Sequence, residues 1–398
     1  MNDNTHRVLL PAGLADILPP EAEHEARVTE SLMASFAKFG YERVKPPLIE
    51  FEDILLSGSG AATSQQTFRM MDPISQRMLG VRADMTLQIA RIASTRLSDV
   101  ARPLRLSYAG QILRVKGSDL RPNRQFGQIG AELIGSNSPE ADAEVVLIAA
   151  SALTELGVPN LSVDLGLPTL VPAICEALDI DLSADELELK TALNLKDEPA
   201  IVRLGEKLGS RASELFSGLL NSVGPADNAL KTLHKIDLPE KAKAELKNMS
   251  AVINCLHERS PNLAITIDPV ETRGYEYHSG VTFTFFALDV RGEIGRGGRY
   301  LADNANGNSG GSGSDETATG VSLFIDSILR ALPEPSPQDR VFVASGSAKI
   351  ALDLRAEGWL VVEQFSADLN NDNPLESAKN AACTHVWDGS KVVPLTDT

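Results

Sequence analysis

The chain is poor in cysteine: it has three, Cys175, Cys255 and Cys383, among 398 residues, and they lie far apart. An odd and scattered set of thiols excludes a disulfide framework and gives no metal-ligand spacing. The apolar runs are shorter than the roughly 18 residues that a membrane-spanning helix needs. The first residues, MNDNTHRVLLPAG, lack the basic and apolar regions of a secretory signal. We therefore expect a reduced, cytoplasmic protein with no metal site and no membrane association.

Positive charge is scarce as well. The sequence has 54 Asp and Glu residues against 37 Lys and Arg residues, which gives a net charge of −17. Nucleic-acid binding draws much of its affinity from cations that neutralise phosphates, and no Lys- or Arg-rich run marks a basic patch. The sequence also has no phosphate-binding loop, nucleophile elbow or HExxH pattern. We therefore expect no nucleic-acid partner and no cofactor.

Short strands and amphipathic helices make up most of what the chain does contain. The length and a hydrophobic fraction of 43% suffice for two or three domains with their own cores. The strand-like segments follow one another in hairpin fashion, without regular strand–helix alternation. This order favours an α+β fold with an antiparallel sheet core over a doubly wound sheet. A helix is expected over residues 21–39 and a hairpin over residues 68–81.

The composition divides the chain into three parts. Residues 168–261 are dense in Leu and Ala and sparse in β-branched residues, which indicates a helical insertion. Residues 1–167 and 262–332 would then form the sheet core. A Pro-Glu-Pro linker at residues 333–335 precedes a small α/β domain over residues 338–398.

The stretch Glu271–Phe286 (ETRGYEYHSGVTFTFF) gathers several chemically versatile side chains at the start of an alternating strand. In a regular strand Arg273, Tyr275 and Tyr277 share one face and His278 lies on the other. A cation flanked by aromatic hydroxyls suits a pocket for a small polar ligand. The alternative is a strand pair with aromatic cross-strand packing, and the spacing alone does not choose between the two.

Six stretches within residues 10–332 follow one known pattern in order. They are Pro11–Pro19 (PAGLADILP), Tyr41–Glu50 (YERVKPPLIE), Arg82–Thr86 (RADMT), Pro103–Glu132, Arg273–Tyr277 (RGYEY) and Gly297–Tyr300 (GGRY). Together they resemble histidyl-tRNA synthetase, a class II aminoacyl-tRNA synthetase. The resemblance implies a class II synthetase-like antiparallel sheet core with flanking helices, and a self-dimer formed through the second stretch.

The chain departs from the synthetase pattern at the positions that hold ATP in that family. Lys116 follows Arg114 where the synthetase has a glutamate that positions adenine, and a cation cannot accept the same hydrogen bond. Phe324 replaces a motif glycine, and Ser327 replaces the arginine that clamps the γ-phosphate. The C-terminal domain resembles only a shortened anticodon-binding domain. The chain is therefore not expected to charge tRNA or to be an enzyme.

The stretch Gly274–Gly280 (GYEYHSG) resembles the family of ATP phosphoribosyltransferase regulatory subunits, where His278 stands in place of the synthetase tyrosine. That resemblance implies a non-catalytic subunit in the first step of histidine biosynthesis. It also implies a short-form catalytic subunit as partner, a hetero-octamer, and histidine as the feedback effector.

The same resemblance implies a histidine-binding site and no catalytic residue. Its expected residues are Asp84, Thr86, Tyr108, Arg114, Gln128, Glu132, Arg273, Tyr275, Tyr277 and His278. Asp84, Thr86 and Gln128 would hold the α-amino group, and Glu132 would accept a hydrogen bond from the imidazole. Arg114 and Arg273 would pair with the carboxylate.

Several alternatives remain open at this point. Glu132 could instead form an ion pair with Arg105 or Arg124, and Asp84 could be a helix N-cap. Histidine could bind at a subunit interface rather than in this pocket. The whole chain could be an active histidyl-tRNA synthetase, or a synthetase-like binding module of another pathway.

Overall fold

The structure is a computed structural model that describes residues 9–57, 63–180, 186–271, 278–302, 316–335, 338–365 and 374–395. It separates into two compact units, Met1–Pro333 and Glu334–Thr398. Among the helices of the described ranges, none combines the length and the apolar character needed to cross a membrane.

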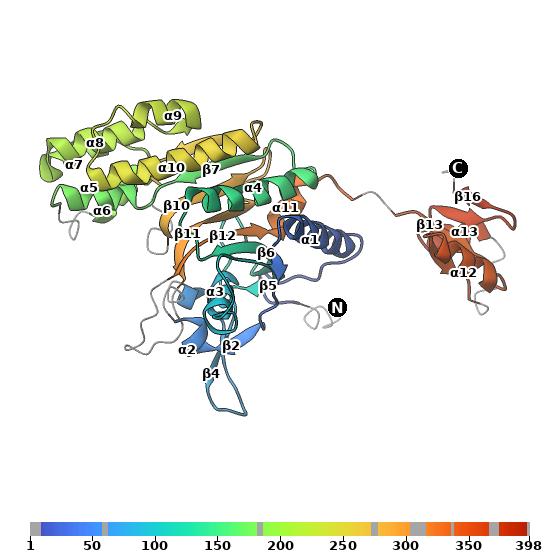
Figure 1. Cartoon of the computed structure of the whole chain (residues 1–398). Helices are drawn as coiled ribbons and strands as arrows, with labels where there is room; N and C mark the ends of the chain where they lie inside the picture. The colour runs from blue at the N-terminus through green and yellow to red at the C-terminus, as the bar shows by residue number, and fades with distance from the viewer. Residues whose placement is uncertain are drawn as a thin grey trace, which may run out of the picture. The chain divides into compact units, whose positions relative to one another are not determined.

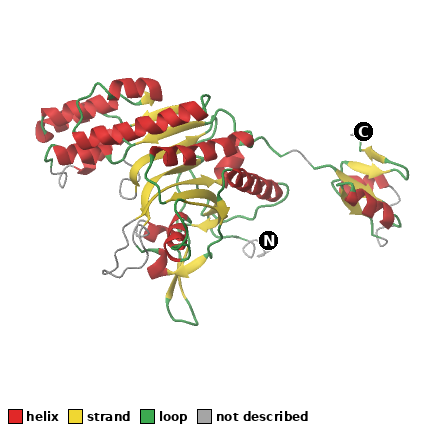
Figure 2. Ribbon diagram, in the orientation of Figure 1, coloured by secondary structure: helices red, strands yellow, loops and turns green. Residues whose placement is uncertain are grey.

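A nine-stranded sheet, built from described residues, forms the centre of the large unit (Figure 1, Figure 2). Its strands lie in the order β1 (Glu42–Arg43), β5 (Leu104–Leu113), β6 (Gln125–Ile134), β12 (Glu316–Phe324), β11 (Gly295–Ala302), β10 (His278–Phe286), β7 (Ser162–Gly166), β9 (Ala264–Asp268) and β8 (Gly224–Pro225). Neighbours are antiparallel except β1 with β5 and β7 with β9. The predicted α+β class with an antiparallel core is confirmed.

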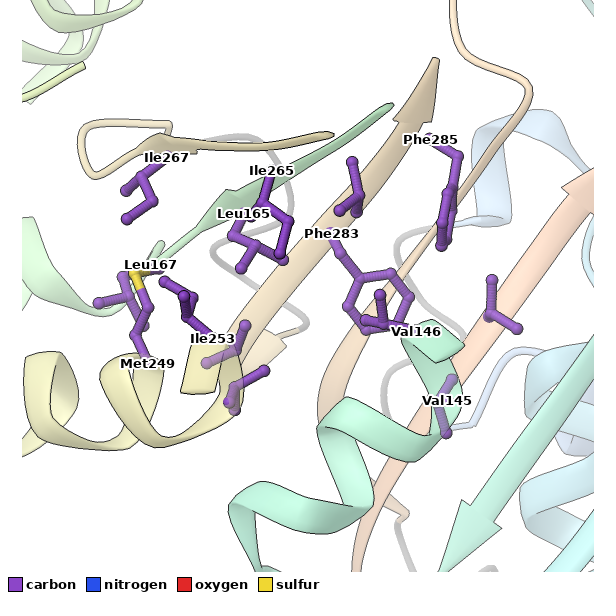
Figure 3. Packing of buried hydrophobic residues seen from close by; sticks show 14 of the residues in the cluster. Val145, Val146, Leu165, Leu167, Met249, Ile253, Ile265, Ile267, Phe283 and Phe285 are labelled. Atoms are coloured by element: carbon purple, nitrogen blue, oxygen red, sulfur yellow. The ribbon is translucent and has the colours of Figure 1, made fainter. Parts of the chain in front are cut away.

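One face of the sheet is covered by the long helices α1 (Glu21–Lys38), α4 (Pro139–Glu155) and α10 (Glu240–Arg259). Figure 3 shows the packing, with Phe283 of β10 beside Val146 of α4. Since successive strand residues point to opposite faces, every second residue of the central strands enters this core. The remaining residues point to the other face, which α3 (Thr86–Thr95) covers in part.

Helix α4 is fixed to the sheet at its first turns. Ser138 accepts a hydrogen bond from the backbone N–H of Ala141, and Pro139 occupies the first turn, as is usual for an N-terminus. Asp142 of α4 pairs with Arg299 of β11 at 2.9 Å, and both side chains are buried. Burial raises the pKa of Asp142, and the guanidinium group of Arg299 opposes that rise.

The segment between β7 and β9 is almost entirely helical. Its helices are α5 (Leu170–Ala177), α6 (Glu186–Asn194), α7 (Glu198–Leu208), α8 (Ser210–Leu220), α9 (Ala226–Leu233) and α10. The two-residue strand β8 lies within it and pairs with β9, which the Leu- and Ala-rich composition did not predict. That residues 168–261 form an insertion into the sheet core stays a prediction.

A small sheet, β2 (Ile49–Phe51), β4 (Met78–Val81) and β3 (Arg69–Met71), lies beside α2 (Glu52–Leu55). Strands β3 and β4 are the hairpin predicted over residues 68–81. Its turn is shaped by Asp72, whose carboxylate accepts hydrogen bonds from the backbone N–H groups of Ile74 and Ser75.

Residues 334–398 form a separate small α/β unit after helix α11 (Ile325–Ala331). It contains β13 (Arg340–Val343), α12 (Ala348–Ala356), β14 (Leu360–Glu363), α13 (Pro374–Asn380), β15 (His385–Trp387) and β16 (Val392–Pro394), with strand order β14-β13-β15-β16. The likeness to an anticodon-binding domain stays a prediction.

Candidate functional site

A cavity of about 370 Å³ lies on the face of the central sheet opposite α4 and α10. Its wall includes the start of α3 and residues of β6, β10, β11 and β12. Five of the ten predicted site residues line it: Asp84, Thr86, Arg114, Glu132 and His278. These residues are spread over almost two hundred positions of sequence, and the sheet brings them together.

Glu132 lies at the inner wall of the cavity and is fully buried. Tyr108 donates its hydroxyl to Oε1 at 3.1 Å, and Tyr300 donates to Oε2 at 2.9 Å. Burial raises the pKa of Glu132 to about 8, and the surrounding hydroxyls hold it below what burial alone would give. At neutral pH Glu132 is therefore mostly protonated, and a positive or hydrogen-donating group that approaches it would favour its ionised form.

The predicted alternative for Glu132, an ion pair with Arg105 or Arg124, is wrong. Arg105 donates from Nε to Glu144 at 2.7 Å, and Arg124 donates to the backbone carbonyls of Arg114 and Ala12. The partners of Glu132 are the tyrosine hydroxyls instead.

Two glycines make room for this buried group. A Cβ on Gly320 of β12 would lie 1.7 Å from Oε2 of Glu132, and a Cβ on Gly130 of β6 would lie 2.3 Å from the hydroxyl of Tyr108. Neither distance is possible for a real side chain, so both polar heads depend on a bare backbone in the neighbouring strand. Tyr300 was not predicted as a site residue, although it ends the motif Gly297–Tyr300.

Tyr108 and Gln128 do not lie among the lining residues and support the site from behind. Gln128 donates from Nε2 to Ser322 Oγ at 2.7 Å, and its Oε1 accepts from the backbone N–H of Met85 at 2.9 Å. Its amide therefore positions the residues that precede α3. The Tyr108 hydroxyl is also within 3.1 Å of Thr86 Oγ1. Tyr108, which was predicted as a site residue, thus contacts through its hydroxyl two residues that line the cavity, Thr86 and Glu132.

Asp84 and Arg114 place opposite charges on the cavity wall. The Asp84 carboxylate faces the cavity. It also accepts a hydrogen bond of 2.9 Å from the backbone N–H of Thr86, the first residue of α3. Arg114 donates from Nε to the carbonyl of Ala83 at 3.3 Å. No carboxylate among the described residues forms an ion pair with Arg114. Burial lowers its pKa, Asp84 opposes this, and the nearby Arg296 lowers it further.

His278 begins β10 and is largely buried beside the cavity. Its Nδ1 lies 3.2 Å from the backbone carbonyl of Arg299, so Nδ1 is the nitrogen that carries hydrogen. Burial lowers the pKa of His278 to about 4 and the carbonyl contact opposes the fall, so the ring is neutral at physiological pH. The other residues predicted from this stretch, Arg273, Tyr275 and Tyr277, lie outside the described residues.

Arg121 was not predicted as a site residue. It contacts Phe324 and Ser327, two of the positions where the sequence departs from the synthetase pattern. Its Nε donates to Asp326 Oδ2 at 3.1 Å and its Nη2 donates to Ser327 Oγ at 3.0 Å. Its Cζ lies 4.0 Å from the centroid of the Phe324 ring. Lys116, the remaining departure, is exposed. No pattern in the sequence singles out Arg121, because its partners Asp326 and Ser327 lie about two hundred residues further along the chain.

The cavity wall thus carries the carboxyl groups of Asp84 and Glu132 together with the partly buried guanidinium group of Arg114. A small zwitterion with one more hydrogen-bonding group matches this arrangement. The described residues contain no group of His, Cys, Asp and Glu side chains that could hold a metal ion.

Comparisons with known proteins agree on one group of relatives. A family model described as histidyl-tRNA synthetase matches residues 13–328. A Paramagnetospirillum magneticum protein named ATP phosphoribosyltransferase regulatory subunit is 50% identical over 386 residues, covering 97% of both chains. A Rhodospirillum centenum protein of the same name is also 50% identical, over 98% of this chain and 97% of its own.

Solved structures share the fold. A Bacillus halodurans crystal structure, titled as an ATP phosphoribosyltransferase regulatory subunit/histidyl-tRNA synthetase, has a TM-score of 0.79 at 24% identity and covers 95% of this chain and 97% of its own. Histidyl-tRNA synthetase from Nostoc has a TM-score of 0.77 at 18% identity, with 95% and 90% covered. The class II synthetase-like fold expected from the sequence is confirmed.

Proposed function

The chain belongs to the family of ATP phosphoribosyltransferase regulatory subunits, and from this premise we propose that it binds free histidine in the cavity and conveys that signal to a catalytic partner. Membership of this family supports a regulatory role for the chain. Histidine as the effector, the pocket it occupies and the partner's nature are the proposal.

The observation that carries the proposal is the charge arrangement of the cavity. In the proposed complex the histidine carboxylate pairs with Arg114, whose terminal nitrogens can offer the two parallel hydrogen bonds that a carboxylate accepts. The α-ammonium group lies near Asp84. The imidazole donates to Glu132, which ionises as it accepts. Arg273 is proposed as a further partner of the carboxylate.

Regulation by histidine then requires that two conformations of the complex differ in their affinity for it. A coupling free energy of about 1–3 kcal/mol between effector and catalytic sites is typical of such systems. We propose the short-form catalytic subunit of ATP phosphoribosyltransferase as the partner, in a hetero-octamer built on a self-dimer of this chain. Size-exclusion chromatography of the mixed chains, with and without histidine, tests this. Separate elution, with no gain in phosphoribosyltransferase activity, would point to another pathway.

We also propose that the chain makes no histidyl-adenylate, because Lys116, Phe324 and Ser327 replace the residues that hold ATP in the synthetases. The competing function is an active histidyl-tRNA synthetase. Histidine-dependent exchange of pyrophosphate into ATP separates the two functions, since only a synthetase supports it. Robust exchange would overturn the regulatory proposal.

Titration calorimetry of Glu132→Gln tests the pocket. The amide keeps the size of the side chain but cannot become an anion, so histidine affinity should fall by at least about tenfold, the equivalent of roughly 1.4 kcal/mol. Glu293→Gln is the matched control, a second carboxylate-to-amide change on the cavity wall near Arg296. It removes negative charge near Arg114, where the histidine carboxylate would lie, and should not weaken binding. Unchanged affinity in Glu132→Gln would place the effector elsewhere, such as a subunit interface.

A further inference from the structure

Three arginines and two phenylalanines form a layered group beside the cavity, and the proposed histidine complex uses only Arg114 among them. Arg114 and Arg296 line the cavity. The Cζ of Arg114 lies 5.2 Å from the centroid of the Phe126 ring, and that of Arg296 lies 5.9 Å from the Phe324 ring. Arg121 contacts both rings, at 4.8 Å and 4.0 Å. The guanidinium group of Arg121 therefore shares its aromatic surfaces with two residues of the cavity wall.

Arg121 is held firmly in this position. It is buried, and both Asp326 and Ser327 at the start of α11 accept its hydrogen bonds. Its Nη2 also lies 3.4 Å from the backbone carbonyl of Glu293. The loop that carries it closes on itself, since the N–H of Ser118 donates to the carbonyl of Arg121 at 2.7 Å. A guanidinium group with this many partners is held in one position beside the lining residues Arg114 and Arg296.

We propose that Arg121 restricts the cavity to ligands of amino-acid size, by filling an aromatic slot between β6 and β12 that would otherwise accept the ring of a nucleotide. A guanidinium group is planar and stacks on aromatic rings. A nucleobase has the same kind of flat face and stacks on the same side chains. Arg114 and Arg296, at the mouth of the slot, would pair with its phosphate.

The arrangement explains two departures from the synthetase pattern, Phe324 and Ser327. Phe324 supplies the nearer ring for Arg121, and the small Ser327 supplies a hydrogen-bond acceptor and the space beside it. Both changes accommodate the Arg121 side chain. The inference deepens the proposed function, on which it rests: the site selects a free amino acid because a cation of the chain itself occupies the nucleotide position.

The test empties the slot and offers it a nucleotide. Arg121→Ala alone would leave the partly buried Asp326 without its cation, and Asp326 Oδ1 already lacks a hydrogen-bond partner. The variant is therefore the double change Arg121→Ala with Asp326→Asn in the full chain. Calorimetry with AMP as the probe should show no saturable binding to the unaltered chain and saturable binding to the double variant. Adding Arg296→Gln should then weaken AMP about tenfold, because the phosphate loses a partner.

Arg124→Ala is the matched control, since Arg124 lies on the same loop and its hydrogen bonds to described residues go to backbone carbonyls. It loosens the loop without emptying the slot, so it should not bind AMP. The inference is overturned if the double variant binds histidine but not AMP, or if the unaltered chain binds AMP equally well. Failure of the proposed function is a different result: no histidine binding to the unaltered chain.

Discussion

Glu132→Gln should make the chain more stable while weakening its proposed effector binding. The pKa of Glu132 is about 8 in the folded chain against 4.5 for the ordinary group, because of burial. A raised pKa means that the folded state holds the proton more tightly than the unfolded state. The stability that depends on this proton is complete below about pH 4.5 and is lost as the pH rises through about 8.

The size of the effect follows from linkage. Between about pH 5 and pH 8, the unaltered chain should lose about 1.4 kcal/mol of unfolding free energy per pH unit relative to Glu132→Gln. From pH 5 to pH 7 the difference amounts to about 3 kcal/mol. Glutamine is the suitable replacement because its neutral amide has one acceptor and one donor end, like a protonated carboxyl group between Tyr108 and Tyr300. An alanine would add the cost of an empty cavity.

The measurement is urea denaturation of both chains at several pH values, monitored by far-ultraviolet circular dichroism. This signal comes mostly from the helices of the large unit, which has most of the helical residues that the structure describes. Tryptophan fluorescence would not, since both tryptophans, Trp359 and Trp387, lie in the small unit. Taking the difference between the two chains cancels every other titrating group. A difference that stays constant from pH 5 to pH 8 would refute the reasoning, since Glu132 would then titrate at its ordinary pKa.

Three further outcomes follow from the same contacts. Histidine binding near pH 7 should release protons because Glu132 ionises, so the calorimetric enthalpy should vary with the ionisation enthalpy of the buffer, and Glu132→Gln should abolish this variation. Gly320→Ala should abolish histidine binding in calorimetry and destabilise the fold by roughly 3 kcal/mol in urea denaturation, because its Cβ overlaps a Glu132 oxygen. Arg299→Ala should lower the free energy of unfolding by about 3–5 kcal/mol in the same assay, because it leaves Asp142 buried and unpaired. A smaller loss in the double variant Arg299→Ala with Asp142→Asn would confirm this cause.

The fold class could be predicted because it depends on local patterns. Hairpin-like strand succession indicated the antiparallel core, and the turn at Asp72 indicated the hairpin of β3 and β4. The two-residue β8 could not be predicted, since its pairing with β9 is a tertiary contact that overrides a helical composition. Register and strand order likewise depend on partners far away in the sequence.

The site was predicted in part for the same reason. Asp84, Arg114 and Glu132 stand in motifs whose spacing is visible in the sequence, and the cavity brings them together. Tyr300 lies 168 residues from the Glu132 carboxyl group that accepts its hydrogen bond, and Arg121 lies 206 residues from its acceptor Ser327. No local sequence pattern predicts partners at such separations. The resemblance drew attention to Phe324 and Ser327, whereas only the structure located Arg121 in contact with both.

Alternate residues of strand β12 contribute to three parts of the site. Gly320 makes room for Glu132, Ser322 accepts the amide of Gln128, and Phe324 lies under Arg121. These three residues are two positions apart and therefore point to one face, while Val321 and Leu323 between them enter the opposite core. A shift of the β12 register by one residue would exchange the two faces of the strand. The space for Glu132, the hydrogen bond to Gln128 and the aromatic contact with Arg121 would then all be lost. The apolar core thus fixes the register of β12, and that register fixes the chemistry of the site.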